Sequence, residues 1–326
     1  MKNLALIYFT EDVDKLSKNA FVGVFSKFLK KLLFPGFFRK LKRVFKLKPH
    51  LDQKFEVDGN FSIQGMRLPY TLKEFNRLGE ASRKRIDKMI LKVCNENSIN
   101  VCILPAICNY SLKSCVKSGF GGRFAYTALL EYILQDLCTK HGLNIREVDI
   151  AVVQGEDEVL PYIVIKLLSP VVKFVTLVTK YRELMDGKIE QICDETGLSV
   201  RITEDLEGVL KSCDFVINYG NIKLSGIKNK LKSNAIVINY GKLEDAQEEL
   251  KETVIGGIDI GLGNKYFQGI DKDVFNFYSS TEIAEIVLLN KLDKSINNFH
   301  DLIEYISVDS FKKCFMEEGF YIRGYL

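Results

Sequence analysis

The stretch that decides the fold is VDIAVVQGEDEVLPYIVIKLL, residues 148–168. It starts with a short apolar run, passes through an acidic turn, and ends in a second apolar segment of helical length. A short apolar run followed by a turn and a helix is typical of the first strand and helix of a parallel α/β layer. We therefore predict a strand from Val148 to Gln154 with a helix behind it.

Similar apolar runs recur toward the C-terminus, with helical patterns between them. Strands that are apolar on both faces are typical of a parallel sheet with helices on both sides, and right-handed crossovers make such a sheet doubly wound. The predicted fold is therefore α/β, with a doubly wound, parallel, Rossmann-type sheet at about residues 147–265. The further strands are predicted at 173–179, 198–203, 214–220, 234–241 and 253–260.

The 326 residues are enough for two domains. Residues 1–122 contain apolar runs at 4–10 and 99–106 with a helical pattern between them, which predicts a smaller N-terminal α/β domain of the kind that binds substrate. Residues 123–326 are predicted to begin with a long linking helix that ends at Gly142, a natural C-cap, and to finish in C-terminal helices.

The net charge of +4 is unevenly distributed. Residues 15–51 contain eleven Lys or Arg and no Asp or Glu, so the rest of the chain carries −7 (4 minus 11). Phenylalanines alternate with these cations, a composition that suits an anionic membrane surface or an acidic carrier protein. A helical pair that packs its phenylalanines into the first domain explains the pattern equally well. The cations concerned are Lys30, Lys31, Arg39, Lys40, Lys42 and Arg43.

Composition also excludes several classes of protein. The basic segment comes with no nucleic-acid-binding motif, so no nucleic-acid partner is expected. No apolar run approaches the roughly 18 residues of a membrane span, and the N-terminus turns acidic too early for a signal peptide. We expect a cytoplasmic protein that the basic segment could hold at a membrane.

The eight cysteines form no C-x-x-C pair and the three histidines are far apart, so no metal site is predicted.

The turn after the first predicted strand is where a Rossmann domain binds the pyrophosphate of a dinucleotide, usually through G-x-G-x-x-G. Gly155 is the only glycine of this turn, and Gln154, Asp157 and Leu160 do not supply the other glycines of the motif. The carboxylates of residues 156–158 would oppose a pyrophosphate at the helix N-terminus. Acidic residues are also ordinary helix-starting chemistry, so a purely structural role is the alternative.

Other candidate ligand residues follow later strands. Lys180 stands at the end of the second strand, where a basic residue could contact the 2′-phosphate of NADP, although a solvent-facing lysine is common there. Tyr219 and Tyr240 follow the fourth and fifth strands, at the edge where open α/β sheets bind ligands. The predicted cofactor-binding residues are Gln154, Gly155, Asp157, Lys180, Tyr219 and Tyr240, and the predicted cofactor is NADP or NAD, or none.

Two further segments carry a family resemblance: SGFGGRFAYTALLEYILQDLCTKHGLNIREVDIAVVQGEDE (residues 118–158) and ITEDLEGVLKSCDFVINYG (residues 202–220). Their order and spacing resemble those of fatty acyl-carrier-protein reductases that form long-chain aldehydes. The chain is more distantly similar to shikimate dehydrogenases and glutamyl-tRNA reductases. The resemblance implies an enzyme that transfers an acyl thioester to a cysteine and reduces it with NADPH.

Lining up AEIVLL (residues 284–289) with the corresponding helix of that family places Glu282 where the family has its nucleophilic cysteine, and a carboxylate cannot form the thiohemiacetal. Cys108 could substitute if Lys113 lowered its pKa, so the catalytic candidates are Cys108, Lys113 and Glu282. Two functions follow. One is a divergent NAD(P)-linked oxidoreductase that acts on an acyl thioester or a related carbonyl substrate. The other is a noncatalytic binding protein for an acyl chain, an anionic lipid or an acidic carrier protein.

Overall fold

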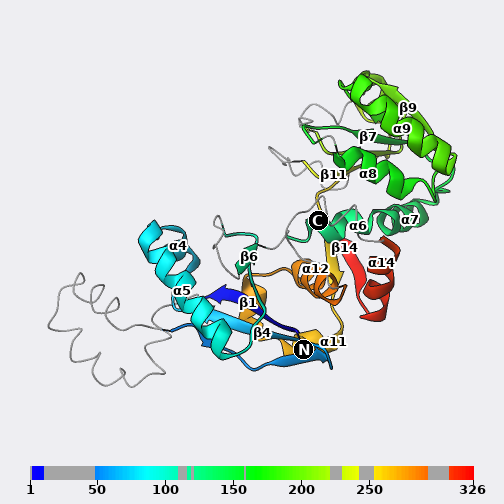
Figure 1. Cartoon of the computed structure of the whole chain (residues 1–326). Coiled ribbons are helices and arrows are strands. Elements are labelled where there is room, and N and C mark those ends of the chain that lie inside the picture. Colours follow the sequence, from blue (N-terminus) through cyan, green and yellow to red (C-terminus); the bar gives the residue numbers. More distant parts are fainter. Residues whose placement is uncertain are drawn as a thin grey trace, which may run out of the picture. The chain divides into compact units, whose positions relative to one another are not determined.

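The structure is a computed structural model, and it divides into two compact units. Unit 1 comprises 1–121 and 263–279, and unit 2 comprises 122–262 and 280–326 (Figure 1). The sequence placed everything after residue 122 in the second domain, whereas the structure groups 263–279 with the first. The described residues are 2–10, 48–108, 116–118, 121–157, 159–220, 230–241, 253–292 and 308–326.

Unit 2 contains the predicted Rossmann-type sheet. Its six strands are all parallel and lie in the order β12-β11-β10-β7-β8-β9. Counted from β7, this is the order 3-2-1-4-5-6 read from the opposite edge, which is the doubly wound Rossmann arrangement. The prediction of fold class is therefore confirmed. The strands are β7 (Ile150–Val153), β8 (Phe174–Val178), β9 (Ser199–Thr203), β10 (Phe215–Asn218), β11 (Ile236–Asn239) and β12 (Val254–Ile255).

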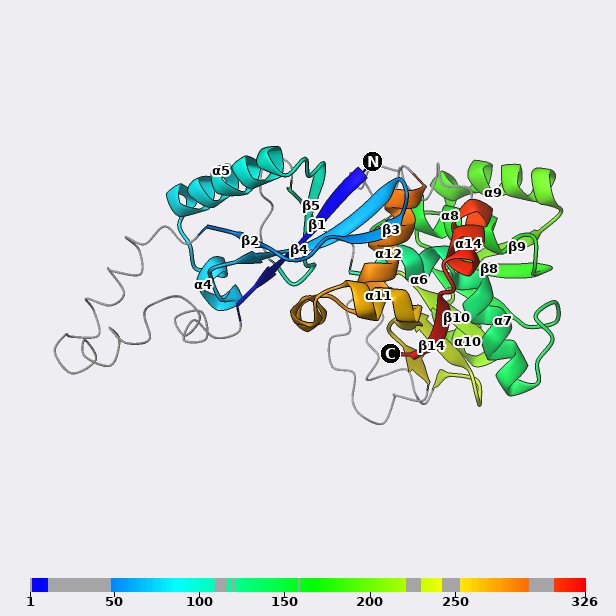
Figure 2. The same cartoon turned by 90° about the horizontal axis from the view of Figure 1, so that it is seen from below.

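Helices cover both faces of this sheet because its central strands are buried on both sides. α8 (Val159–Leu168) and α9 (Arg182–Thr196) pack together on one face, and α10 (Leu206–Ser212) lies on the other (Figure 2). Ala151 and Val153 of β7 belong to the apolar cluster formed with α10. The two residues between and before them point to the opposite face, as the period of a strand requires. The turn after β7 is thus held between two packed layers.

The remaining part of unit 2 differs in detail from the predicted helices. The linking helix is two helices, α6 (Arg123–Ala128) and α7 (Leu130–His141), and α7 ends at Gly142 in the left-handed conformation. The predicted strand 253–260 is divided at residues 256–257 into β12 and β13 (Ile258–Gly261). After α12 (Ser280–Lys291) and α14 (Val308–Glu317), the chain ends in β14 (Tyr321–Tyr325), which pairs with β13.

Unit 1 is built on a mixed sheet in which β1 pairs in parallel with β4 and β5. β2 and β3 pair antiparallel with β4, and β6 follows β5. Buried residues of α5 pack on one face of the sheet. The elements are β1 (Lys2–Phe9), β2 (His50–Leu51), β3 (Phe55–Asp58), β4 (Phe61–Leu68), α4 (Leu72–Asn76), α5 (Glu80–Glu96), β5 (Val101–Leu104), β6 (Val116–Ser118), α11 (Asn264–Gly269) and η4 (Lys272–Asn276).

Two fully buried tyrosines of unit 1 differ in how their hydroxyls are accommodated. The Tyr278 hydroxyl lies 2.8 Å from the carbonyl oxygen of Ile7 and 2.6 Å from that of Ile103, so it ties residue 278 to two neighbouring strands. The Tyr8 hydroxyl is near Asp52, but it makes no well-formed hydrogen bond within the described residues. Burial, followed by the neighbouring carboxylate, raises the pKa of Tyr8.

Replacing each tyrosine by phenylalanine should therefore give opposite results. Tyr8→Phe removes a buried hydroxyl that lacks a good partner, and we expect no loss of unfolding free energy or a small gain. Tyr278→Phe removes a well-placed donor, and we expect a loss of about 1–2 kcal/mol. Denaturant unfolding of both variants checks this. A Tyr8→Phe loss as large as that of Tyr278→Phe would contradict the description of Tyr8.

Candidate functional site

The candidate site lies at the carboxyl edge of the unit 2 sheet, where the strand order reverses between β7 and β10. Open α/β sheets bind ligands at this point because the connections on either side leave the sheet in opposite directions. Gln154 follows β7, Tyr219 follows β10 and Tyr240 follows β11. Adjacent parallel strands bring these three predicted residues to one edge of the sheet.

The turns at this edge pack backbone against backbone. A Cβ atom on Gly155 would lie 2.3 Å from the carbonyl oxygen of Tyr219, and one on Gly241 would lie 2.6 Å from the carbonyl oxygen of Gly220. A Cβ atom on Gly220 would lie 3.0 Å from the carbonyl oxygen of Gln154. The protein's own neighbouring turn thus accounts for the one glycine retained in the predicted phosphate loop.

Asp157 serves as the cap of α8. Its Oδ1 accepts hydrogen bonds from the backbone N–H groups of Val159 at 2.9 Å and Leu160 at 3.1 Å. A dinucleotide would place its pyrophosphate on these same free N–H groups of the first helical turn. The residues present therefore do not fit a diphosphate in the usual place, because a fixed carboxylate already uses the donors and would repel the ligand.

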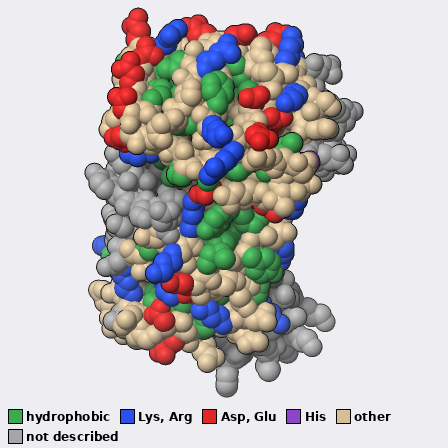
Figure 3. Space-filling view, turned by 90° about the vertical axis from the view of Figure 1, so that its right-hand side faces the viewer, with side chains coloured by type: hydrophobic (Ala, Val, Ile, Leu, Met, Phe, Trp, Pro, Cys, Tyr) green, Lys and Arg blue, Asp and Glu red, His purple; other side chains and the backbone are tan. Residues whose placement is uncertain are grey.

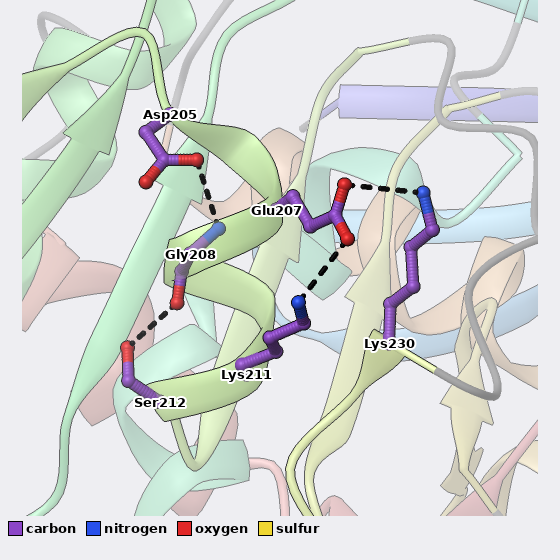
Figure 4. A network of polar contacts seen from close by, with 6 residues as sticks. All are labelled: Asp205, Glu207, Gly208, Lys211, Ser212 and Lys230. Carbon is purple, nitrogen blue, oxygen red and sulfur yellow. Dashed lines mark hydrogen bonds and ion pairs between the residues drawn. The ribbon is translucent and has the colours of Figure 1, made fainter.

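The same capping chemistry occurs at α10, on an exposed surface. Asp205 Oδ1 accepts from the N–H of Gly208 at 2.9 Å, and Glu207 in the first turn pairs with Lys211 at 3.2 Å and Lys230 at 3.5 Å (Figure 4). An aspartate just before a helix thus caps both α8 and α10. The structural interpretation of the acidic turn accounts for Asp157 as well.

Tyr219 and Tyr240 belong to an aromatic stack. Their ring centroids are 4.5 Å apart and the rings are nearly parallel, while Tyr126 of α6 lies 4.4 Å from Tyr240. The Tyr240 hydroxyl donates to the carbonyl of Tyr126 at 3.1 Å, and the Tyr126 hydroxyl donates to the carbonyl of Ile255 at 2.9 Å. Burial raises the pKa of all three tyrosines, which keeps the hydroxyls neutral. The stack packs α6 onto the carboxyl edge of the sheet.

The other polar residues at this edge differ in their hydrogen bonding. Asn218 donates to Asn239 at 2.7 Å and accepts from the N–H of Gly220, so both asparagine side chains hold the ends of their strands. The side-chain oxygen and nitrogen of Gln154 are buried without a hydrogen-bond partner among the described residues. Lys180 is exposed just beyond β8. Gln154 and the Tyr219 hydroxyl, which is likewise buried without a hydrogen-bond partner among the described residues, are therefore the polar groups here that the fold itself does not explain.

The predicted catalytic residues are not assembled into one described site. Cys108 is buried in the apolar cluster of unit 1, and Glu282 is buried on α12 of unit 2. Lys113 lies outside the described residues, as do the six cations of the basic segment. Among the described residues, no group of three or more His, Cys, Asp or Glu could hold a metal ion. None of those residues forms a helix long and apolar enough to cross a bilayer.

Sequence reasoning missed Glu285, one turn along α12 from Glu282. Its side chain is 1% exposed, and it accepts hydrogen bonds from the N–H groups of Gly122 at 3.3 Å and Ala125 at 3.0 Å, at the start of α6. Burial, opposed by these hydrogen bonds and aided by Glu282, raises the pKa of Glu285 to about 7. Two carboxylates within the apolar run STEIAEIVLL were the available signal.

Comparisons with known proteins add structural likenesses only. No family model and no curated protein matches the sequence. A dipicolinate synthase subunit from Bacillus halodurans has a TM-score of 0.38 at 14% identity, over 90% of this chain and 96% of that one. Shikimate 5-dehydrogenase from Listeria monocytogenes, in complex with shikimate and NAD, has a TM-score of 0.32 at 10% identity, over 88% and 96%. L-tryptophan dehydrogenase from Nostoc punctiforme has 0.33 at 14%, over 78% and 77%.

Glu285 should make the stability of the protein depend on pH. Between about pH 4.5 and 7 the folded state keeps a proton that the unfolded state releases, so the unfolding free energy should fall as pH rises through this window and level off above it. Glu285→Gln should remove this slope, which we expect to amount to about 1–3 kcal/mol. Denaturant unfolding at pH 5, 6, 7 and 8 measures it.

Glu207→Gln is the matched control. This glutamate is exposed, and its hydrogen bond with Lys211 and the charge of Lys230 lower its pKa. Its contribution to the unfolding free energy is therefore lost as pH falls, so the pH slope from Glu207 has the opposite sign to that from Glu285. If the wild-type slope persisted in Glu285→Gln, another group would be responsible.

Proposed function

We propose that the protein is a noncatalytic binding protein that keeps the Rossmann architecture of an oxidoreductase without its diphosphate cradle. The observation that carries the proposal is the Asp157 carboxylate on the free N–H groups of α8. Electrostatics adds to this observation, because Glu156 is exposed beside the same turn. A pyrophosphate would have to displace a hydrogen-bonded cap and approach two carboxylates of its own sign.

The absence of the expected nucleophile supports the same proposal. Glu282 stands at the position that the resemblance to acyl-carrier-protein reductases gives to cysteine, and it is 5% exposed. A buried carboxylate cannot accept an acyl group as a thioester. The alternative nucleophile that the sequence offered, Cys108, is packed among apolar side chains of unit 1. The position of the family's nucleophile is thus filled by a group that cannot form the acyl thioester.

The second candidate is a divergent NAD(P)-linked oxidoreductase acting on an acyl thioester or a related carbonyl compound. It is favoured by the complete 3-2-1-4-5-6 strand order and by exposed Lys180 after β8, where the 2′-phosphate of NADP would lie. In that case the cofactor would be held by Lys180 and the edge residues rather than by the N-terminus of α8.

Calorimetric titration with NADPH and NADH separates the two candidates. We expect no binding by the wild-type protein at millimolar cofactor. Asp157→Gly frees the two N–H groups and removes one charge, so it should gain weak binding, whereas the matched variant Asp157→Asn removes only the charge and should gain less. Micromolar binding of NADPH by the wild type, lost in Lys180→Ala, would establish the oxidoreductase instead.

We propose an anionic lipid surface as the partner of the basic segment 15–51. Its charge contrasts with the face drawn in Figure 3, where Lys and Arg alternate with Asp and Glu. Phenylalanine interleaved with lysine favours a membrane interface, because the rings can enter the headgroup region while the cations pair with lipid phosphates. An acidic carrier protein would use the cations but not the interleaved phenylalanines so directly.

The lipid partner can be tested by co-sedimentation with vesicles of phosphatidylcholine containing phosphatidylserine. We expect binding that weakens with added salt and is lost when Lys30, Lys31, Arg39 and Lys40 are replaced by glutamine. The control replaces four exposed lysines elsewhere, Lys84, Lys92, Lys140 and Lys313, and should bind normally. Absence of binding at low salt would leave the segment a role in packing.

A further inference from the structure

Two cysteines of unit 1 lie in direct sulfur contact. The Sγ atom of Cys94, in the last turn of α5, is 3.2 Å from the Sγ atom of Cys102 in β5, and both residues are reduced. Their exposed fractions are 2% and 0%. Bonded sulfurs are about 2.0 Å apart, so a shift of little more than an ångström separates this contact from a disulfide.

The backbone between the two residues fixes this contact. The N–H of Ile99 donates to the carbonyl of Cys94 at 2.9 Å, and Ser98 takes the left-handed conformation with φ of 53°. This is the hydrogen-bond pattern of a Schellman C-cap, which turns the chain sharply back from the helix. The N–H of Asn100 then donates to the carbonyl of Asn3 at 2.8 Å and leads the chain into β5. The two cysteines therefore face each other because of the turn.

The two partners differ in their freedom to move. Cys102 lies in the middle of the sheet, in register with Ala5 of β1 and Val116 of β6. Cys94 lies at a helix end, and the four residues after it are all exposed. Opening of a last helical turn costs far less than global unfolding, so Cys94 can reach solvent while the sheet stays intact.

We propose that Cys94 and Cys102 are a redox modification site that closes into a reversible disulfide when the protein meets a peroxide. In the first step the Cys94 sulfur attacks hydrogen peroxide, which gives a sulfenic acid and one water. In the second step the Cys102 thiol attacks that sulfur, the S–S bond forms and a second water leaves. Two thiols are thus oxidised and one peroxide is reduced, and a small dithiol reverses the step by exchange.

Cys138 and Cys213 of unit 2 lack this arrangement. Both are buried, and burial raises the pKa of both thiols, but neither sulfur contacts another cysteine among the described residues. Cys138 is thus a matched control: it is buried to the same degree as Cys94, near a helix end, but it has no such sulfur contact. The bridge would covalently fasten the end of α5 to the sheet of unit 1.

The test treats the full chain with hydrogen peroxide under native conditions and follows intact mass, thiol count and linked peptides. We expect the wild type to lose two hydrogens and two of its eight thiols, with one bridge joining the peptides of Cys94 and Cys102, and to recover both thiols with dithiothreitol. Cys94→Ala and Cys102→Ala should each abolish the bridge. Cys138→Ala should leave it unchanged.

The peptide map of the wild type decides the matter even if a variant folds poorly. A bridge to any other cysteine, formation of the bridge only in denaturant, or stepwise addition of oxygen to single thiols without a bridge would each overturn the proposal.

Discussion

The structure of unit 2 depends on the approach of the turn after β7 to the turn after β10. The Gly155 backbone lies against the Tyr219 carbonyl so closely that no side chain could stand between them. This contact aligns the two central strands of the sheet and closes the place where the strand order reverses. In dinucleotide-binding proteins a glycine here lets the backbone meet a pyrophosphate. In this chain the same freedom serves contact between two parts of the protein.

That constraint explains how the acidic turn is tolerated. Backbone packing holds the turn in place without a ligand. The free N–H groups of α8 therefore need an acceptor from the protein itself, and Asp157 supplies it. This cap satisfies two of the free N–H groups at the helix start, and these are the donors that an anionic ligand would need. Gln154 and the Tyr219 hydroxyl are the remaining polar groups at this edge that are buried without a hydrogen-bond partner among the described residues. The N-terminus of α8 thus finds its acceptor within the protein itself.

The chain passes between the two units at residues 121–122, 262–263 and 279–280, and α12 anchors the unit 2 side of these crossings. Thr281 accepts from the N–H of Ile260 at 3.0 Å and donates to the carbonyl of Ile258 at 2.8 Å. One turn later Glu285 holds the start of α6. The hydrogen bonds from the backbone N–H groups fix the position of the buried Glu285 carboxylate relative to α6. Because burial raises the pKa of this carboxylate, its effect on the unfolding free energy depends on pH. The junction of unit 2 is therefore both firm and sensitive to protonation.

The sequence by itself determined the parallel sheet, because runs such as 148–154 are apolar on both faces and only a doubly covered layer buries both. It also determined that the glycines of the phosphate loop are missing, since a motif is a local property. The sequence also offered the helix-starting role of Asp157, whose partner Val159 is two residues away. Only the tertiary structure decided what Gly155 and Glu285 do, because their partners, Tyr219 and Ala125, are far from them in sequence. A pattern of residue types cannot reveal contacts that depend on how distant turns approach each other.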